Sequence, residues 1–215
     1  MEAHRPDTTS RILDVSEQLF VEPGFEGTSL RMITQQAEVN LAAVNYHFGS
    51  KDALFEAVFI RRLAPLITAC LAELDRLETL PLQSPEALVM TFVRPCLELS
   101  KDPSRGGAMF VRLLSRTLVE NHRVLRETVS QQYSVFVERY GEAFGRVLPH
   151  LGAEERAWRM HFTFSVMFNA FAGNDVLKIF TRSQIVSARD PDMIVRHLVP
   201  YVVSALVAPA IGNLK

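Results

Sequence analysis

The chain has 215 residues, of which 48% are hydrophobic and 22% are charged, and its formal net charge is −1. This length and apolar content suffice for one large core or two small ones, and they exclude an intrinsically disordered chain. The nearly neutral charge means that no overall basic field indicates a nucleic-acid partner.

The two cysteines, Cys70 and Cys96, lie in apolar helical patterns without a CxxC spacing. We interpret them as small buried residues in a reducing compartment, with a redox-sensing disulfide as the alternative. The N-terminus is polar, and the longest apolar run, residues 198–211, is shorter than the roughly 18–20 residues that span a bilayer. The sequence therefore predicts a soluble, cytoplasmic protein without a membrane partner.

The first predicted helix covers about residues 8–22, with Asp7 or Thr8 as its cap. Apolar residues recur along it at intervals of three and four, which is the spacing of one helical face. Pro23-Gly24 is expected to end the helix, and Phe25 to pack back against it.

Two shorter helices follow, joined by a tight turn. Thr28 or Ser29 is expected to cap the second, and the third covers about residues 41–48, where Val44 and Phe48 form an inward pair at i, i+4. This succession of short helices predicts a helix-turn-helix unit.

The outward positions of the third helix carry side chains that suit a DNA groove. Small or unbranched residues at its start permit a close approach to base edges, and Asn45 can bond an adenine edge in bidentate fashion. Hydroxyl, imidazole and ammonium groups around it can contact phosphates. The residues expected to contact DNA are Thr28, Arg31, Leu41, Ala42, Ala43, Asn45, Tyr46, His47 and Lys51.

The charge of this segment opposes the prediction. Residues 1–63 contain six basic and nine acidic side chains, a formal charge of −3. The case for DNA binding therefore depends on geometry and motif.

The remainder of the chain is also predicted to be helical. Ser50 caps a helix from Lys51 to about Leu80 that Pro65 is expected to kink, and a following helix from Pro85 to Lys101 is expected to be interrupted at Pro95. Further helices are expected near 108–120, 123–148, 154–180 and 191–208. The prediction is an all-α protein of about nine helices, with a DNA-binding domain at 1–53 and an effector-binding and dimerisation domain at 54–215.

The last two predicted helices have the pattern of an interface. Apolar residues recur at heptad-like spacing on one face of each, and other faces are apolar as well, which favours a four-helix bundle between two chains. These stripes are Ala157, His161, Phe164, Phe168 and Phe171 on the first helix and Ile194, Leu198, Tyr201, Ala205 and Ala208 on the second.

Between the two ends of the chain lies a set rich in Phe and Met, which is either ordinary core or an apolar tunnel for a small lipophilic effector. Within it, Arg112 and Arg116 lie one helical turn apart, so that one of them can bind an anionic head group. The candidate effector-binding residues are Phe92, Met109, Phe110, Arg112, Leu113, Arg116, Phe136, His161, Phe164 and Phe168.

The runs Gly24-Phe25-x-x-Thr28-Ser29-Leu30-Arg31-x-Ile33 and Asn45-Tyr46-His47-Phe48-Gly49-Ser50-Lys51-x-x-Leu54 closely resemble the N-terminal domain of the TetR family of transcriptional regulators. The resemblance covers roughly residues 8–60. It implies a homodimeric, ligand-responsive regulator, most often a repressor, that binds a palindromic double-stranded operator.

Two residues depart from the family pattern. Glu38 stands where the family usually has Gly, and a positive φ there costs Glu about 1 kcal/mol. Asn45 replaces a more usual apolar or aromatic residue, so the family's operator preferences do not carry over.

Residues 40–51, Met109 to Leu114 and Trp158 to Phe162 are similar to the PsrA-type subgroup of TetR regulators. That resemblance implies control of fatty-acid metabolism by a long-chain fatty acid or acyl-CoA. The alternatives are another hydrophobic effector, such as a drug or an aromatic compound, and a purely helical interaction protein.

An enzyme is the remaining alternative, and the sequence argues against it. It contains no HExxH, glycine-rich phosphate loop or GxSxG, and its six histidines lack metal-ligand spacing. We therefore expect no catalytic residue, no metal and no cofactor.

Overall fold

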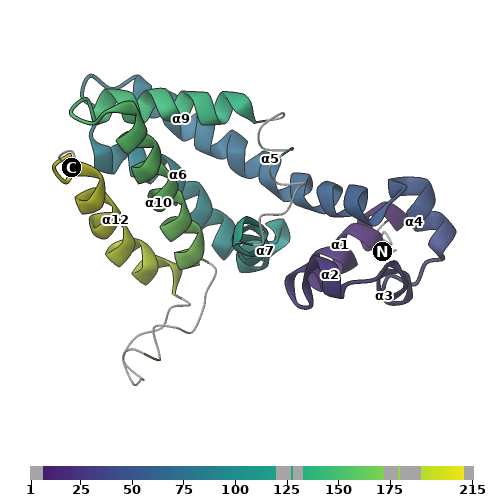
Figure 1. Ribbon diagram of the computed structural model, residues 1–215. Coiled ribbons are helices and arrows are strands. Elements are labelled where there is room, and N and C mark those ends of the chain that lie inside the picture. Colours follow the sequence, from purple (N-terminus) through teal and green to yellow (C-terminus); the bar gives the residue numbers. More distant parts are fainter. Residues whose placement is uncertain (1–6, 120–126, 128–132, 172–178, 180–189, 211–215) are drawn as a thin grey trace, which may run out of the picture.

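The computed structural model describes residues 7–119, 127, 133–171, 179 and 190–210. Over these ranges the regular structure is helical and contains no strand, which confirms the all-α prediction. Figure 1 shows a head of short helices at one end, the other helices gathered into a body, and α5 running from one to the other. The head contains α1 (Thr8–Val21), α2 (Gly24–Gly27), α3 (Leu30–Gln36) and α4 (Leu41–Phe48). The long connecting helix and the body are α5 (Lys51–Glu78), α6 (Pro85–Lys101), the 3₁₀ turn η1 (Pro103–Arg105), α7 (Gly107–Val119), α9 (Ser134–Val147), α10 (Ala153–Phe171) and α12 (Pro191–Val207).

The helix starts follow from side-chain caps. Each capping oxygen accepts a hydrogen bond from a backbone N–H two or three residues later, which satisfies a donor that the first turn leaves unpaired. Such a cap contributes about 1 kcal/mol. The capping residues are Asp7, Ser29, Asn40, Ser50, Ser84 and Asp190.

The segment after α1 differs from the prediction of a simple stop. Gly24, at φ +84°, begins the one-turn helix α2, which brings Phe25 back over the head. The Phe25 ring lies 5.9 Å from Phe20 and 5.1 Å from Phe55 between centroids. The expected packing of Phe25 is therefore present, with an extra helical turn.

The turn between α3 and α4 has the left-handed backbone that the sequence raised as a possibility. Glu38 lies at φ +53°, and it is the one residue other than glycine with a positive φ in the described part of the chain. This conformation costs a residue with a side chain about 1 kcal/mol.

Three prolines of the described residues lie inside unbroken helices, the third being Pro200 of α12. Pro65 is in α5 and Pro95 is in α6, so the prediction that Pro95 interrupts its helix is wrong. Each ring removes one backbone donor, but the buried residues on either side, such as Leu63 and Leu66, hold the helix against its neighbours.

One hydrophobic core runs from the head into the body, and Phe59 joins Phe110 across the junction, with ring centroids 5.6 Å apart. Cys70 and Cys96 are buried free thiols, and burial raises the pKa of Cys70 to about 12. A thiol with that pKa stays protonated at neutral pH, which agrees with their interpretation as core residues. No helix in the described ranges is long and apolar enough to cross a membrane.

The predicted helices at 123–148 and 154–180 are seen in part. Their described portions are α9 and α10, while residues 120–126, 128–132, 172–178 and 180–189 lie outside the described residues.

Candidate functional site

The outward face of α4 is exposed as predicted. Tyr46 is 86% exposed and Leu41 50%, and Ala42 and Asn45 are also exposed. On the opposite side Val44 is only 1% exposed. The helix is therefore fixed by its inner side while small and hydrogen-bonding side chains face outward.

Polar groups surround this face. The His47 imidazole Nδ1 lies 3.3 Å from the Thr9 hydroxyl at the start of α1. The Lys51 ammonium lies 4.2 Å from the Phe25 ring centroid, a cation–π contact that holds it at the beginning of α5. Arg31 is exposed on α3. An imidazole, an ammonium and a guanidinium group are of the kinds that contact phosphates in protein–DNA complexes.

Thr28 does not belong to this surface, which corrects the prediction. It is 1% exposed, and its hydroxyl donates to the carbonyls of Leu19, at 2.9 Å, and Gly24, at 2.7 Å. The side chain pins α2 to α1 and is not available to DNA.

Part of the acidic excess of the head faces the body. Arg61 of α5 contacts Asp14 at 2.8 Å and Glu17 at 2.6 Å, and Arg62 contacts Glu17 at 2.9 Å. These carboxylates are neutralised at the junction between head and body. The formal charge of −3 for residues 1–63 already counts both arginines, so the acidic excess that opposes DNA binding is unchanged.

Four of the candidate effector residues come together in the body. The Phe92 ring lies 5.0 Å from Phe164, 5.3 Å from Phe168 and 6.5 Å from Phe136 between centroids. Tyr140 continues this aromatic cluster, 4.6 Å from Phe136. The rings come from α6, α9 and α10 and are in contact with one another.

The α7 candidates are not in this cluster. Met109, Arg112 and Arg116 lie on one face of α7, because positions i, i+3 and i+7 of a helix point to the same side. On this face Met109 and Arg112 are exposed, and Arg116 is directed to the head. Phe110 is fully buried against Phe59 at the junction, and Leu113 is buried as well. The prediction that Arg112 and Arg116 face an apolar tunnel is therefore corrected.

His161 is also outside the cluster. It is exposed on the outer face of α10, where its ring lies 6.1 Å from Trp158 and 5.6 Å from Phe162 between centroids. Phe164, three residues later, is half-buried and lies at the edge of the face that packs on the body.

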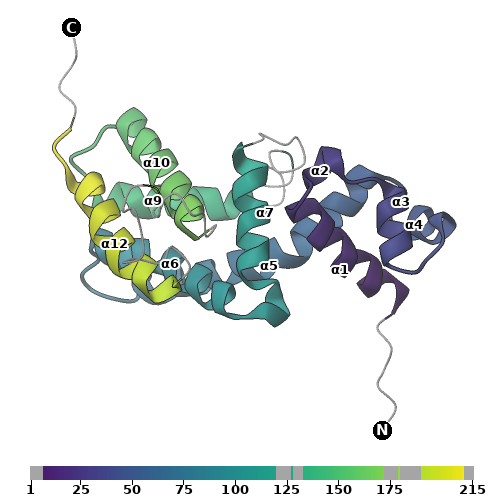
Figure 2. The same cartoon turned by 90° about the horizontal axis from the view of Figure 1, so that it is seen from below.

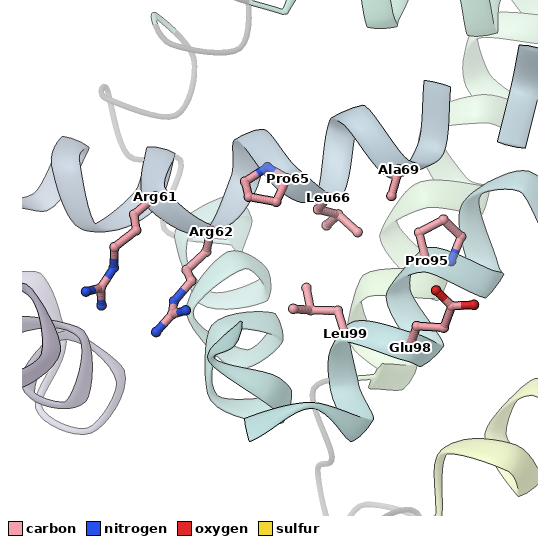
Figure 3. Close-up of a pocket in the computed structure, with 8 residues that line it drawn as sticks. All are labelled: Arg61, Arg62, Pro65, Leu66, Ala69, Pro95, Glu98 and Leu99. Carbon is pink, nitrogen blue, oxygen red and sulfur yellow. The ribbon is translucent and has the colours of Figure 1, made fainter. Parts of the chain in front are cut away.

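Hollows among the described residues include three that lie away from the aromatic cluster. One of about 60 Å³ lies between α5 and α6, where Leu66 and Leu99 point toward each other while Arg61 and Arg62 extend toward the head (Figure 3). A second, of about 150 Å³, lies between α10 and α12. A third is an open groove of about 580 Å³ beside Glu73 and the loop that follows α5. Of these three, the groove alone has the roughly 300–1,000 Å³ of a typical ligand site.

Part of the predicted interface stripe of α10 is not at the surface of the chain. Phe164, Phe168 and Phe171 turn inward, whereas Trp158 and Phe162 are 55% and 57% exposed. Tyr201 of α12 is 65% exposed, as its predicted interface position requires. The spacing of Trp158 and Phe162 at i, i+4 was the available signal, but Phe164 and Phe168 have the same spacing.

Arg159 is a further residue that the sequence did not reveal. Its guanidinium donates to the carbonyls of Leu206, at 2.7 Å, Ala208, at 2.6 Å, and Pro209, at 2.8 Å, and it also pairs with Glu155. It therefore ties α10 to the C-terminal end of α12, where unpaired carbonyls accumulate.

A head with an exposed α4 on a helical body defines a class, the helix-turn-helix regulators with a separate regulatory part. Comparison with known families gives the particular one. Residues 12–58 match the family described as bacterial regulatory proteins, tetR family, and residues 90–205 match the tetracyclin repressor-like, C-terminal domain. The chain belongs to the TetR family, whose members are ligand-responsive, DNA-binding transcription regulators and not enzymes.

Individual relatives are more distant. The chain is 41% identical over 49 residues to the probable HTH-type transcriptional regulator YttP of Bacillus subtilis, a match that covers 23% of this chain and 24% of the relative. A structure of a tetR-family regulator from Shewanella sp. PV-4 has a TM-score of 0.63 at 16% identity and covers 94% of this chain and 97% of its own. The fatty acid degradation regulator FadR from Bacillus halodurans has a TM-score of 0.61 at 14% identity and covers 99% of each chain. These two structures establish similarity of fold alone.

Proposed function

We propose that this regulator binds a palindromic operator as a homodimer and acts as a repressor that a hydrophobic ligand releases. The observation that carries the proposal is the pairing of two exposed faces on one chain, one on α4 and one on α10 and α12. Such a protein acts on DNA, so we place it in the cytoplasm. The head, residues 1–53, and the body, residues 54–215, divide within the first turn of α5.

In this proposal α4 lies in the major groove. Asn45 bonds a base edge, while Leu41, Ala42 and Ala43 let the start of the helix approach the bases. A second set positions the head on the sugar-phosphate backbone. Its members are Arg31, Tyr46, His47 and Lys51.

The dimer is proposed to form through α10 and α12. Trp158, Phe162 and Tyr201 form an exposed aromatic patch, and large aromatic residues are typical anchors of protein interfaces. Packing two copies of this face builds a four-helix bundle. A two-fold axis there places two α4 helices about 34–36 Å apart, which is one turn of DNA.

The proposed effector is a long-chain fatty acid or acyl-CoA, and the regulated genes are those of fatty-acid metabolism. The support is the aromatic cluster around Phe92, whose rings would part to line an apolar site, together with the similarity of fold to a regulator described as acting in fatty acid degradation. A drug or an aromatic compound is the second candidate, because aromatic rings also stack on planar ligands. Binding shifts the population toward a state in which α5 displaces the two heads, which requires tighter effector binding in that state.

Selection from random duplexes followed by fluorescence anisotropy tests the proposal. We expect a two-fold symmetric operator, and we expect oleate or oleoyl-CoA to weaken its binding at least tenfold. A panel of drugs and aromatic acids serves as the comparison. If saturating oleate and oleoyl-CoA leave the operator affinity unchanged, the fatty-acyl assignment is wrong; if no duplex is enriched, the operator assignment is wrong.

A further inference from the structure

Helix α7 of the body contacts helix α1 of the head near both of its ends. Figure 2 shows α7 lying beside α1 where head and body meet, and the two helices are in extensive contact. One attachment is made by Arg116, in the last turn of α7, and the other lies at Gly106, just before its first turn.

Arg116 closes the C-terminal end of α1. Its guanidinium donates to the carbonyls of Val21, at 3.2 Å, Glu22, at 3.0 Å, and Pro23, at 3.5 Å. The last carbonyls of a helix have no partner within it and carry the negative end of the helix dipole. A charged donor with a planar fork satisfies several of them at once.

Gly24 provides the space that this contact needs. A Cβ at this position would lie 2.3 Å from Arg116 Nη2 and 2.5 Å from Arg116 Cζ, which is closer than real atoms approach. The backbone at Gly24, with φ +84°, also disfavours a side chain. The position of the Arg116 guanidinium therefore requires a residue without a side chain at position 24.

The other attachment is the close approach of Gly106 to an ion pair between α1 and α5. Glu17 of α1 is 3% exposed and binds both Arg61 and Arg62, and Arg62 also donates to the Ser104 carbonyl at 3.1 Å. A Cβ at Gly106 would lie 2.7 Å from Glu17 Oε1, so α7 begins directly against this pair. The two attachments hold α1 along the length of α7.

Helix α7 also reaches the aromatic cluster. The Ser115 hydroxyl donates to the carbonyl of Phe168 in α10 at 2.7 Å, and the Phe168 ring packs on Phe92. Ser115 is the direct neighbour of Arg116 in the chain. Two contacts therefore link the aromatic cluster to the end of α1, the hydrogen bond of Ser115 to Phe168 and that of Arg116 to Glu22.

We propose that Arg116 is a positioning residue through which the state of the body sets the position of the DNA-binding head. A change at Phe168 moves Ser115, the neighbouring guanidinium follows, and α1 follows with the rest of the head. This route leads directly from α7 to α1 and complements the path through α5. It rests on the proposed function in one respect, that a ligand acts on the aromatic cluster.

Operator affinity is the first test, measured on the duplex selected with the wild-type chain. We expect Arg116→Ala to weaken binding by roughly threefold to tenfold, because a head that is no longer fixed loses more freedom on binding. Arg116→Lys, which keeps the charge and loses the fork, is expected to recover part of the affinity. Arg76→Ala, which removes an exposed arginine of α5 that pairs with Glu73, is the charge-matched control and is expected to leave affinity unchanged. Equal affinities for Arg116→Ala and Arg76→Ala would overturn the proposal.

Amide hydrogen exchange tests the same contact without DNA or ligand. In Arg116→Ala we expect the amides of Val21 and Glu22 to exchange roughly tenfold faster, since the end of α1 loses charged hydrogen bonds. Amides of α12 are expected to be unaffected. Unchanged exchange at the end of α1 would show that Arg116 does not hold it, even if no operator is found.

Substitutions at two glycines distinguish the effect of the Arg116 contact from the effect of backbone strain. Gly24→Ala meets both a positive φ and the guanidinium, whereas Gly49→Ala meets a positive φ of 77° with no atom within 4 Å. We expect Gly24→Ala to lower Tm by several degrees more than Gly49→Ala. In the Arg116→Ala background this excess is expected to disappear, since the clashing group is gone. An excess that persists there would count against the contact.

The last test uses oleate as the probe. If oleate releases the wild-type chain, we expect Arg116→Ala to bind oleate as before, judged by thermal shift, and to lose most of the release. Full release in the variant would overturn the coupling. If oleate does not act on the wild-type chain, the effector assignment fails, while the affinity and exchange tests still decide the role of Arg116.

Discussion

The outward faces of α4 and of the α10–α12 pair differ in chemistry although both are exposed. The α4 face combines small residues with hydrogen-bonding groups, as at Ala42 and Asn45, and the α10–α12 face presents the aromatic side chains Trp158, Phe162 and Tyr201. A groove of polar base edges and phosphates fits the first, and another apolar protein surface fits the second. Both faces are proposed as sites, and their different chemistry distinguishes the two proposed partners.

The two faces are also anchored differently. Val44, buried beneath α4, fixes that short helix, and a capping Asn40 starts it, with 2.8 Å from its Oδ1 to the Ala43 nitrogen. The α10–α12 pair is tied by Arg159 across the end of α12 and by buried residues such as Leu206. Each face can therefore be changed without removing its support.

The largest effect is expected from a charge on the apolar face. Phe162→Asp places a carboxylate at the centre of the proposed dimer contact, where truncation of an anchor already costs about 2 kcal/mol or more. We expect a monomer by light scattering and a loss of operator binding of more than tenfold. Val137→Asp, at a valine of α9 that is 50% exposed, is the control. A dimer that persists in Phe162→Asp would refute this assignment of the interface.

The next effect concerns base recognition by α4. We expect Asn45→Ala to cost roughly 1–3 kcal/mol of binding and to relax the selected sequence at one position per half-site. Gln36→Ala, on the neighbouring helix α3, is expected to leave the sequence preference unchanged. An Asn45→Ala preference identical to wild type would mean that this residue reads no base.

A third change tests the support of the α10–α12 face. Arg159→Ala removes charged hydrogen bonds to several carbonyls at the end of α12, and such a bond contributes about 1.5–3 kcal/mol. We expect a lower free energy of unfolding in urea and a weaker dimer, with no change in the sequence preference. A variant with normal dimer affinity and reduced stability would show that Arg159 stabilises the fold without supporting the interface.

A smaller effect is expected at Lys51. Lys51→Ala removes one ammonium beside the start of α5, so binding to all sequences weakens alike. We expect the slope of log affinity against log salt concentration to flatten by about one. An unchanged slope would exclude a phosphate contact by this residue.

The smallest effect is expected at Glu38. Glu38→Gly relieves the positive φ before α4 and is expected to raise the free energy of unfolding by about 1 kcal/mol or less. Thermal denaturation measures it, and the sequence preference of α4 is expected to stay the same. Destabilisation would indicate that the Glu38 side chain contributes more than its strain costs.

Much of the head was predictable because its determinants are local. Caps such as Ser29 and Ser50, and the inward position of Val44, follow from neighbours within four residues. The positive φ at Glu38 was foreseeable from the resemblance, because the TetR family usually has Gly at this position. Thr28 was misassigned because its partners, Leu19 and Gly24, depend on how α2 folds back on α1.

The body was less predictable because its helices are apolar on more than one side. The pattern of α10 fits an inward face through either Phe162 or Phe164, and periodicity alone does not choose between them. Packing against α6 and α9 made the choice, by bringing Phe164 onto Phe92.

The sequence alone thus determined the all-helical class, the helix starts and the residues that α4 turns outward, since these depend on short-range hydrogen bonds and helical spacing. Only the tertiary structure decided which aromatic residues are exposed on α10 and where Arg116 is bound. The carbonyl of Glu22 that Arg116 contacts lies 94 residues away in the chain, and such a pairing is set by how two helices pack.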